Sequence, residues 1–134
     1  MYRIYQQPDD FEAIIQIFSP EDGGRMTPPF NGIRWDFAYA GDHVPTDGLF
    51  MIWPDFFNEK GDSLPTDQPL PIGVGLRARM TVVVDEMRAC LHRARISVGV
   101  AFYCHEGSKR VAAGTVTKIT GLFAERSASQ SSAA

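Results

Sequence analysis

Residues 76–84 read LRARMTVVV, and apolar side chains alternate with polar or charged ones along most of this stretch. One side would carry Leu76, Ala78, Met80, Val82 and Val84, and the other Arg77, Arg79 and Thr81. Successive side chains of an extended strand leave opposite faces, so a period of two indicates one buried face and one wet face. The stretch therefore predicts a strand of an antiparallel sheet with a single apolar face.

The same alternation recurs along the chain, in residues 11–17, 33–39, 96–104 and 111–119. Turn-forming residues separate these runs, such as Asp-Gly-Gly at 22–24, Asn-Gly at 31–32 and Glu-Gly-Ser at 106–108. About six short strands punctuated in this way predict an all-β domain. A sandwich and a small closed barrel are both compatible with the pattern, since closure removes exposed sheet edges.

Residues 85–95 are the one candidate for a helix. Met87, Leu91 and Ala94 fall at helical spacing, but the run is short and follows a strand directly. A helix, a loop and a single helical turn all remain compatible with this segment.

Composition and charge narrow the class of protein. A chain of 134 residues is expected to form one domain, and its net charge of −3 disfavours nucleic-acid binding, which usually needs a basic excess. Two cysteines make no disulfide framework, and the N-terminal residues lack the apolar core of a signal peptide. No stretch approaches the ~20 apolar residues that span a bilayer. We therefore expect a soluble cytoplasmic protein that has no membrane partner.

The sequence carries no recognisable catalytic machinery. No glycine-rich loop ends in Lys-Ser or Lys-Thr, so the motif that cradles nucleotide phosphates is absent from these residues. Cys104 and His105 are neighbours and point to opposite faces of a predicted strand, which does not suit a zinc site. We predict no catalytic, cofactor-binding or metal-binding residue. The weaker alternative, a small thiol- or metal-dependent enzyme, would have to use Cys90 or Cys104 with one of the histidines His43, His92 and His105.

Residues 49–57 read LFMIWPDFF and gather large apolar side chains inside the least regular part of the chain. One interpretation is a further buried strand with a loop folded over the end of the sheet. The other is an exposed anchor for a partner, since Trp and Phe dominate the energetics of protein interfaces. The candidate partner-binding residues are Phe50, Trp53, Phe56 and Phe57.

Two blocks of the sequence resemble a known family. Residues 11–13 (FEA) and 21–30 (EDGGRMTPPF), followed by Arg34 and Phe37, and residues 106–119 (EGSKRVAAGTVTKI) are similar to the start and the end of one domain. That domain is the C-terminal β-barrel, domain 3, of bacterial translation elongation factor Tu. The resemblance implies a six-stranded antiparallel closed β-barrel over residues 11–121. Residues 1–10 would then be an N-terminal extension, 122–134 a flexible tail, and 42–71 a long inserted loop.

The resemblance also implies partners. In that family the domain contacts the T-stem of aminoacyl-tRNA, the family's own GTPase domain and the nucleotide-exchange factor. These residues include no match to the GTPase domain, so GTP binding is not implied. Residues similar to the family's RNA-facing positions, together with neighbouring cations, are Arg25, Thr27, His92, Glu106, Gly107, Lys109 and Arg110.

Three departures from the family's pattern weaken the expectation of tRNA binding. Met26 replaces a histidine, Asp36 replaces a glutamine, and His92 lies near the position of a lysine. A carboxylate near phosphates and a lost cation both reduce affinity. We therefore expect a non-catalytic module that binds a protein partner or forms a homo-oligomer, with tRNA or RNA binding as the alternative.

Overall fold

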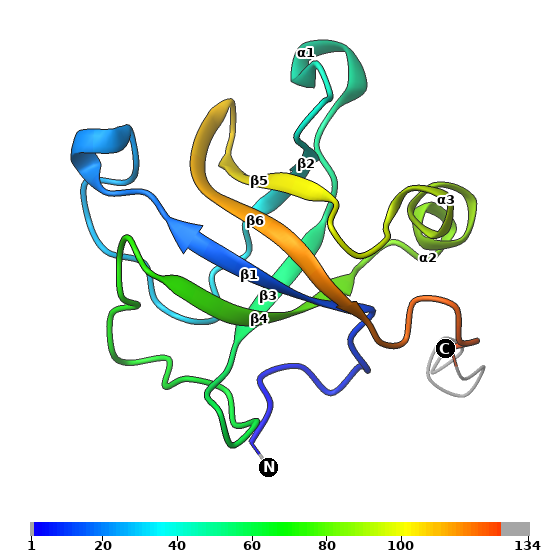
Figure 1. The fold of residues 1–134 in the computed structure, drawn as a ribbon, viewed down its shortest axis with the longest axis horizontal. Coiled ribbons are helices and arrows are strands. Elements are labelled where there is room, and N and C mark those ends of the chain that lie inside the picture. Colours follow the sequence, from blue (N-terminus) through cyan, green and yellow to red (C-terminus); the bar gives the residue numbers. More distant parts are fainter. Residues whose placement is uncertain (1, 127–134) are drawn as a thin grey trace.

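The computed structural model describes residues 2–126, which form one curved sheet with short helical connections (Figure 1). The strands are β1 (Phe11–Ile17), β2 (Asp36–Tyr39), β3 (Ile52–Phe56), β4 (Gly75–Val82), β5 (Ala101–Glu106) and β6 (Lys109–Ile119). They pair antiparallel in the order β2-β5-β6-β1-β4-β3. The predicted all-β class is confirmed.

The sheet is an open half-barrel, so the predicted closure is wrong. Strands β2 and β3 are its edges, and an isolated bridge joins Phe37 of β2 to Phe50, which precedes β3. There, the amide of each residue donates to the carbonyl of the other, at 2.8 and 2.9 Å. Beyond this bridge the chain leaves β2 at Tyr39 and forms a short helix, α1 (Val44–Asp47), before it reaches β3.

The inner face of the sheet holds the core. Alternate residues of β1, from Phe11 to Ile17, are almost fully buried, as their period of two predicts. The Phe37 and Phe102 rings stack with 4.6 Å between their centroids, and Phe11 meets both rings edge-on. Such aromatic contacts add to the stability that buried area alone provides.

Residues 85–95 form a helical segment rather than a loop. It consists of α2 (Asp85–Met87), a wide π-helical turn (Arg88–His92) and α3 (Arg93–Arg95). The wide turn buries both Arg88 and His92 against the end of the sheet. Two further short helical turns, η1 (Pro20–Asp22) and α1, lie in the connections.

Strand β5 begins later than the alternation predicts. Ile96 is buried, but it follows α3 directly, and the chain then turns before Ala101. Gly99 has a φ of +96°, a backbone conformation that glycine adopts readily and other residues rarely do. The turn therefore interrupts a run of alternating residues that pattern alone would place in one strand.

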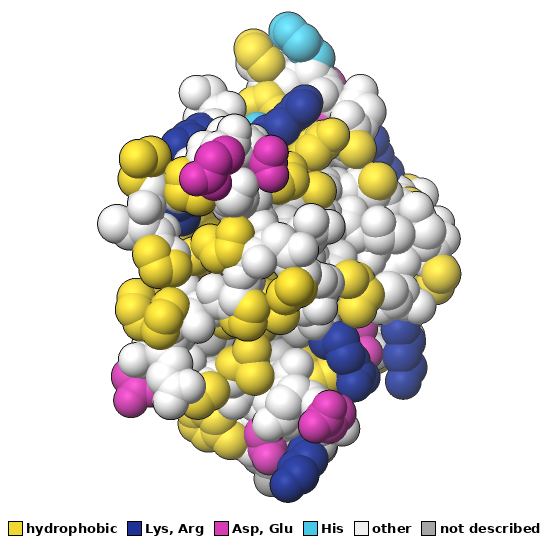
Figure 2. All heavy atoms as spheres, turned by 60° about the vertical axis from the view of Figure 1, so that its left-hand side comes forward, with side chains coloured by type: hydrophobic (Ala, Val, Ile, Leu, Met, Phe, Trp, Pro, Cys, Tyr) yellow, Lys and Arg dark blue, Asp and Glu magenta, His cyan; other side chains and the backbone are white. Residues whose placement is uncertain are grey.

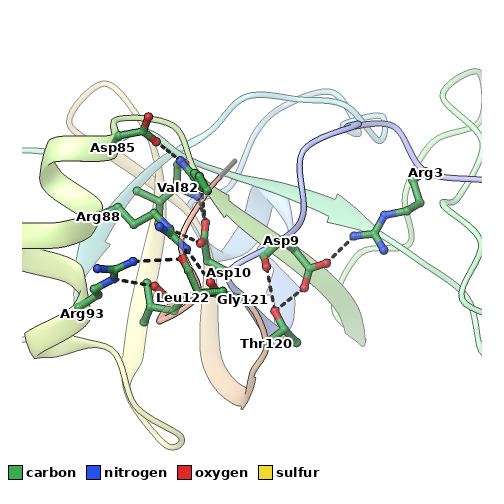
Figure 3. A network of polar contacts seen from close by, with 12 residues as sticks. Arg3, Asp9, Asp10, Val82, Asp85, Arg88, Arg93, Thr120, Gly121 and Leu122 are labelled. Atoms are coloured by element: carbon green, nitrogen blue, oxygen red, sulfur yellow. Dashed lines mark hydrogen bonds and ion pairs between the residues drawn. The ribbon is translucent and has the colours of Figure 1, made fainter. Parts of the chain in front are cut away.

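A buried polar network fastens the two ends of the chain to the sheet (Figure 3). Asp10 accepts hydrogen bonds from Arg88 (2.6 Å), Arg126 (2.8 Å) and the amide of Val82 (2.7 Å). Arg88 also donates to the carbonyl of Gly121 at 2.5 Å. The expected extension at 1–10 thus ends in a buried carboxylate.

The segment expected to be a flexible tail is in contact with the sheet as far as it is described. Leu122 is fully buried, and its carbonyl accepts a hydrogen bond of 2.8 Å from Arg93. Residues 127–134, the rest of the predicted tail, lie outside the described residues. Among residues 2–126, no helix combines the length and the apolar character needed to cross a membrane.

Candidate binding surfaces

The aromatic segment 49–57 is largely part of the core. Phe56 is fully buried, and Phe57 is only 6% exposed, covered by the guanidinium groups of Arg77 and Arg79. Phe50 packs against Tyr39 and against His92, whose ring centroid is 4.9 Å away. The alternative of a buried strand therefore describes this segment, and these phenylalanines do not form an exposed anchor.

Trp53 is half-buried on the outside of β3. The guanidinium of Arg34 lies 4.3 Å from its ring, and the ring of Tyr5 lies 6.2 Å away. The indole therefore contacts two side chains of this chain and stays partly exposed. The alternation of β3 explains the difference from Phe56, because Trp53 points away from the core.

His92 does not belong to an RNA-facing surface. It is 1% exposed, and its Nδ1 shares a hydrogen bond of 2.6 Å with the hydroxyl of Tyr39. Burial and the nearby charge of Arg95 lower the pKa of His92 to about 4. A neutral, buried imidazole cannot neutralise a phosphate, so the prediction for this residue is corrected.

The other predicted RNA-facing residues gather around the turn between β5 and β6. Arg25 forms an ion pair of 2.6 Å with Glu106 and donates to the carbonyl of Thr27 at 3.1 Å. Glu106 also accepts a hydrogen bond of 2.8 Å from the indole of Trp35. The fold thus brings together residues that lie some eighty positions apart in the sequence. We call Arg25, Thr27, Glu106, Gly107, Lys109 and Arg110 the turn surface.

The charges of the turn surface are unequally balanced. The positive charge of Arg25 is compensated by Glu106. By contrast, none of the ion pairs among residues 2–126 involves Lys109 or Arg110. Met26, the residue after Arg25, is 81% exposed.

A second surface, which the alternation did not single out, lies on the outer face of β1, β5 and β6. Two rows of outward side chains cross these strands, one of Ile14, Thr115 and Ala101, the other of Gln16, Ala113 and Tyr103. We call these six residues the apolar sheet face. None of them is charged, although the outer face of a sheet is usually its polar side.

The apolar sheet face forms the floor of a hollow of about 510 Å³. Gly75 closes one side, where a Cβ would come within 3.0 Å of Ile14, and Asp22 of η1 contributes to the rim. Hydrophobic side chains gather on the side of the molecule that carries η1 in Figure 1, with few charges among them (Figure 2). The small floor residues leave room for a partner's backbone or side chains to approach the sheet closely.

The sequence held one signal for this surface. Residues 13–15 read Ala-Ile-Ile, so the apolar Ile14 stands at a position of β1 where the alternation predicts a polar, outward-facing side chain. It is 39% exposed. Its neighbours Ala101 and Ala113 are too small to register as apolar patterning.

The two cysteines lie in different environments. Cys104 is buried in the core, and its burial raises its pKa to about 12, so it is a neutral thiol at neutral pH. Cys90 is exposed. Within residues 2–126, no group of three or more His, Cys, Asp or Glu side chains could hold a metal ion.

No family model matches this sequence.

Proposed function

We propose that this chain is a non-catalytic module that binds another protein through the apolar sheet face. The observation that carries the proposal is a hollow on the outer side of a sheet whose floor, which includes Ile14, Ala101 and Ala113, carries no charge. Solvated outer faces are normally polar, and exposed apolar patches commonly mark interaction sites. A floor without charges suits a protein surface better than a phosphate backbone.

The resemblance to domain 3 of elongation factor Tu is part of this proposal. A domain derived from a larger assembly would keep apolar outer faces where other domains once packed. The six antiparallel strands and the meeting of Arg25 with Glu106 support the relationship. The proposed function includes no GTPase activity.

The test is affinity capture from the native cytoplasm with the wild type and the double variant Ile14→Glu/Ala101→Glu. Both side chains are exposed, so two carboxylates should leave the fold intact and abolish capture by placing charge on the apolar floor. Phe123→Glu, at a 61% exposed residue outside the hollow, is the matched control. Undiminished capture by the double variant would contradict the proposal. Sedimentation of the purified chain measures its oligomeric state, and a dimer would identify a second copy of this chain as the partner.

RNA binding at the turn surface is the second candidate. It is supported by Lys109 and Arg110. Neither cation forms an ion pair with a carboxylate among the described residues. Titration with tRNA should reveal an affinity that falls steeply between about 50 and 200 mM salt. It should also fall in the variant Lys109→Gln/Arg110→Gln. Absence of binding at the lower salt concentration would remove this candidate.

A further inference from the structure

A separate hollow of about 540 Å³ lies between the β5–β6 turn and α1. Its lining includes the polar residues Asp22, Asp42, His105, Ser108, Lys109 and Arg110. It shares only Phe18 and Asp22 with the hollow over the apolar sheet face. Its polar lining sets it apart from that uncharged floor.

The charges around this hollow favour an anion. Lys109 and Arg110 take part in no ion pair within residues 2–126, and Arg110 is held over the ring of Tyr103 at 4.1 Å. The carboxylate of Asp42 is engaged by both terminal nitrogens of Arg95, at 3.0 and 3.1 Å. The Asp22 carboxylate accepts a hydrogen bond of 3.0 Å from Ser19. Two cations therefore face the hollow with only Asp22 as an unneutralised carboxylate.

His105 adds an independent indication of a ligand. It is 3% exposed, and its Nδ1 lies 3.2 Å from the carbonyl oxygen of Gly107. A carbonyl can only accept, so Nδ1 carries the hydrogen and Nε2 of the neutral ring is an acceptor. That Nε2 is buried and has no hydrogen-bond partner. Burial lowers the pKa of His105, which keeps the ring neutral at neutral pH. An unpaired buried acceptor is costly, so a donor from a ligand would stabilise it.

We propose that this hollow binds a phosphate group, with Lys109, Arg110 and Ser108 contacting its oxygens and Nε2 of His105 accepting a hydrogen bond from its O–H group. Phosphate near neutral pH carries both anionic oxygens and an O–H group, so one ion can satisfy the cations and Nε2 together. Nε2 is closed to solvent in the free chain, so binding requires a side chain at the wall to move. Arg110, the cross-strand neighbour of His105, is exposed and long enough to do so.

This chemistry distinguishes phosphate from similar anions. Sulfate has the same tetrahedral shape but carries no proton at neutral pH, so it leaves Nε2 without a donor. A carboxylate ligand has the same defect. The site therefore requires an oxyanion that is also a hydrogen-bond donor, as inorganic phosphate is at neutral pH. The inference is independent of the proposed protein binding.

The experiment is an NMR titration of the full chain with inorganic phosphate and, separately, with sulfate at constant ionic strength and neutral pH. Phosphate should shift the amide signals of residues 108–110 and the ring signals of His105, and sulfate should bind about tenfold more weakly. Lys109→Gln/Arg110→Gln should weaken phosphate binding by at least about tenfold. These side chains are exposed, so the fold should persist.

The matched control is Lys118→Gln, which removes an exposed cation at the other end of β6 and should leave phosphate binding unchanged. Equal affinity for sulfate, or no shifts at residues 108–110, would overturn the proposal. A titration with a short RNA containing only internal phosphodiesters identifies the source of the phosphate. Such phosphates carry no O–H at neutral pH, so an RNA that binds through Lys109 and Arg110 should leave the ring signals of His105 unchanged, and shifts of those signals as large as with inorganic phosphate would overturn the role given to His105.

Discussion

At the scale of single residues, the described chain buries several ionisable side chains, each with a specific partner. His92 is held by Tyr39, and the Asp10 carboxylate receives two guanidinium groups. Burying such groups is unfavourable unless their hydrogen bonds are made, so their partners determine how stability responds to pH and to substitution.

Stability should fall on acidification because of His92. Its pKa is lowered from the ordinary value of 6.5 to about 4, so between these pH values the unfolded chain binds a proton that the folded chain does not. The native state is therefore favoured most above pH 6.5 and loses about 3 kcal/mol as the pH falls to 4. Urea unfolding at a series of pH values would measure this loss.

The matched variants for that experiment are His92→Gln and His43→Gln. His92→Gln should remove most of the stability loss between pH 6.5 and pH 4, even if the variant is less stable than the wild type at neutral pH. His43→Gln, at an exposed histidine, should leave this loss unchanged. If the His92→Gln variant still loses the same stability on acidification, another group is responsible for the loss. His105 is one such group, because its pKa is also lowered by burial.

Asp10→Asn should destabilise the fold by about 3–5 kcal/mol, because it leaves the buried guanidinium of Arg88 without its counter-charge. Denaturant unfolding at neutral pH measures this change. Asp85→Asn is the control, since its ion pair with Arg126 involves a carboxylate whose side chain is 59% exposed and should contribute less than about 1 kcal/mol. Similar losses of stability in both variants would contradict the attribution of the Asp10→Asn effect to the buried charge of Arg88.

At the scale of elements, alternation predicts strands well where one face is buried throughout. It succeeds for β1, whose apolar residues line the core from end to end, and only in part for β4, where Leu76 is partly buried and the outward-facing Arg79 and Thr81 are buried as well. It fails for residues 96–100, because Ile96 is buried by the helical segment rather than by a strand. It also leaves residues 85–95 undecided, since the wide turn at Arg88–His92 departs from helical spacing.

Gly114 of β6 illustrates how closely two strands are packed. A Cβ built there would overlap the ring of Phe102, which is 1% exposed on the neighbouring strand β5. Gly114→Ala should therefore cost about 1–3 kcal/mol through overpacking, measurable as a lower thermal midpoint. Adding Phe102→Leu should recover part of the loss, so the two substitutions would be non-additive.

Gly41→Ala is the corresponding control, because nothing lies within 4 Å of its Cβ position and its φ is not in the left-handed region. It should leave the thermal midpoint almost unchanged. A Gly114→Ala variant as stable as the wild type would mean that the Phe102 ring has room to move.

At the scale of the whole molecule, the sequence predicts the fold class but not the shape of the sheet. Whether β2 and β3 join depends on where the chain leaves β2, and only the Phe37–Phe50 bridge forms. The turn surface could be predicted in part, because Arg25 and Glu106 do meet, whereas His92 could not. The apolar sheet face escaped prediction because its alanines carry almost no hydrophobic signal.

The end of the core near the helical segment is closed by Leu122, which is fully buried after the last strand. Leu122→Ala should cost about 2–5 kcal/mol, because a fully buried leucine is replaced by a cavity. Phe123→Ala should change the stability little, since this ring is 61% exposed. Calorimetric unfolding of the two variants provides the comparison, and equal stabilities would contradict the closing role of Leu122.

Within this sheet, strand β1 is synthesised before the other strands, yet both of its neighbours, β4 and β6, come much later in the chain. Its apolar residues thus have no neighbouring strand until β4 has been synthesised, and the second neighbour, β6, is complete only at residue 119. Because such distant contacts form slowly and expose apolar surface meanwhile, a nascent chain of this protein should depend on chaperones until synthesis passes β6.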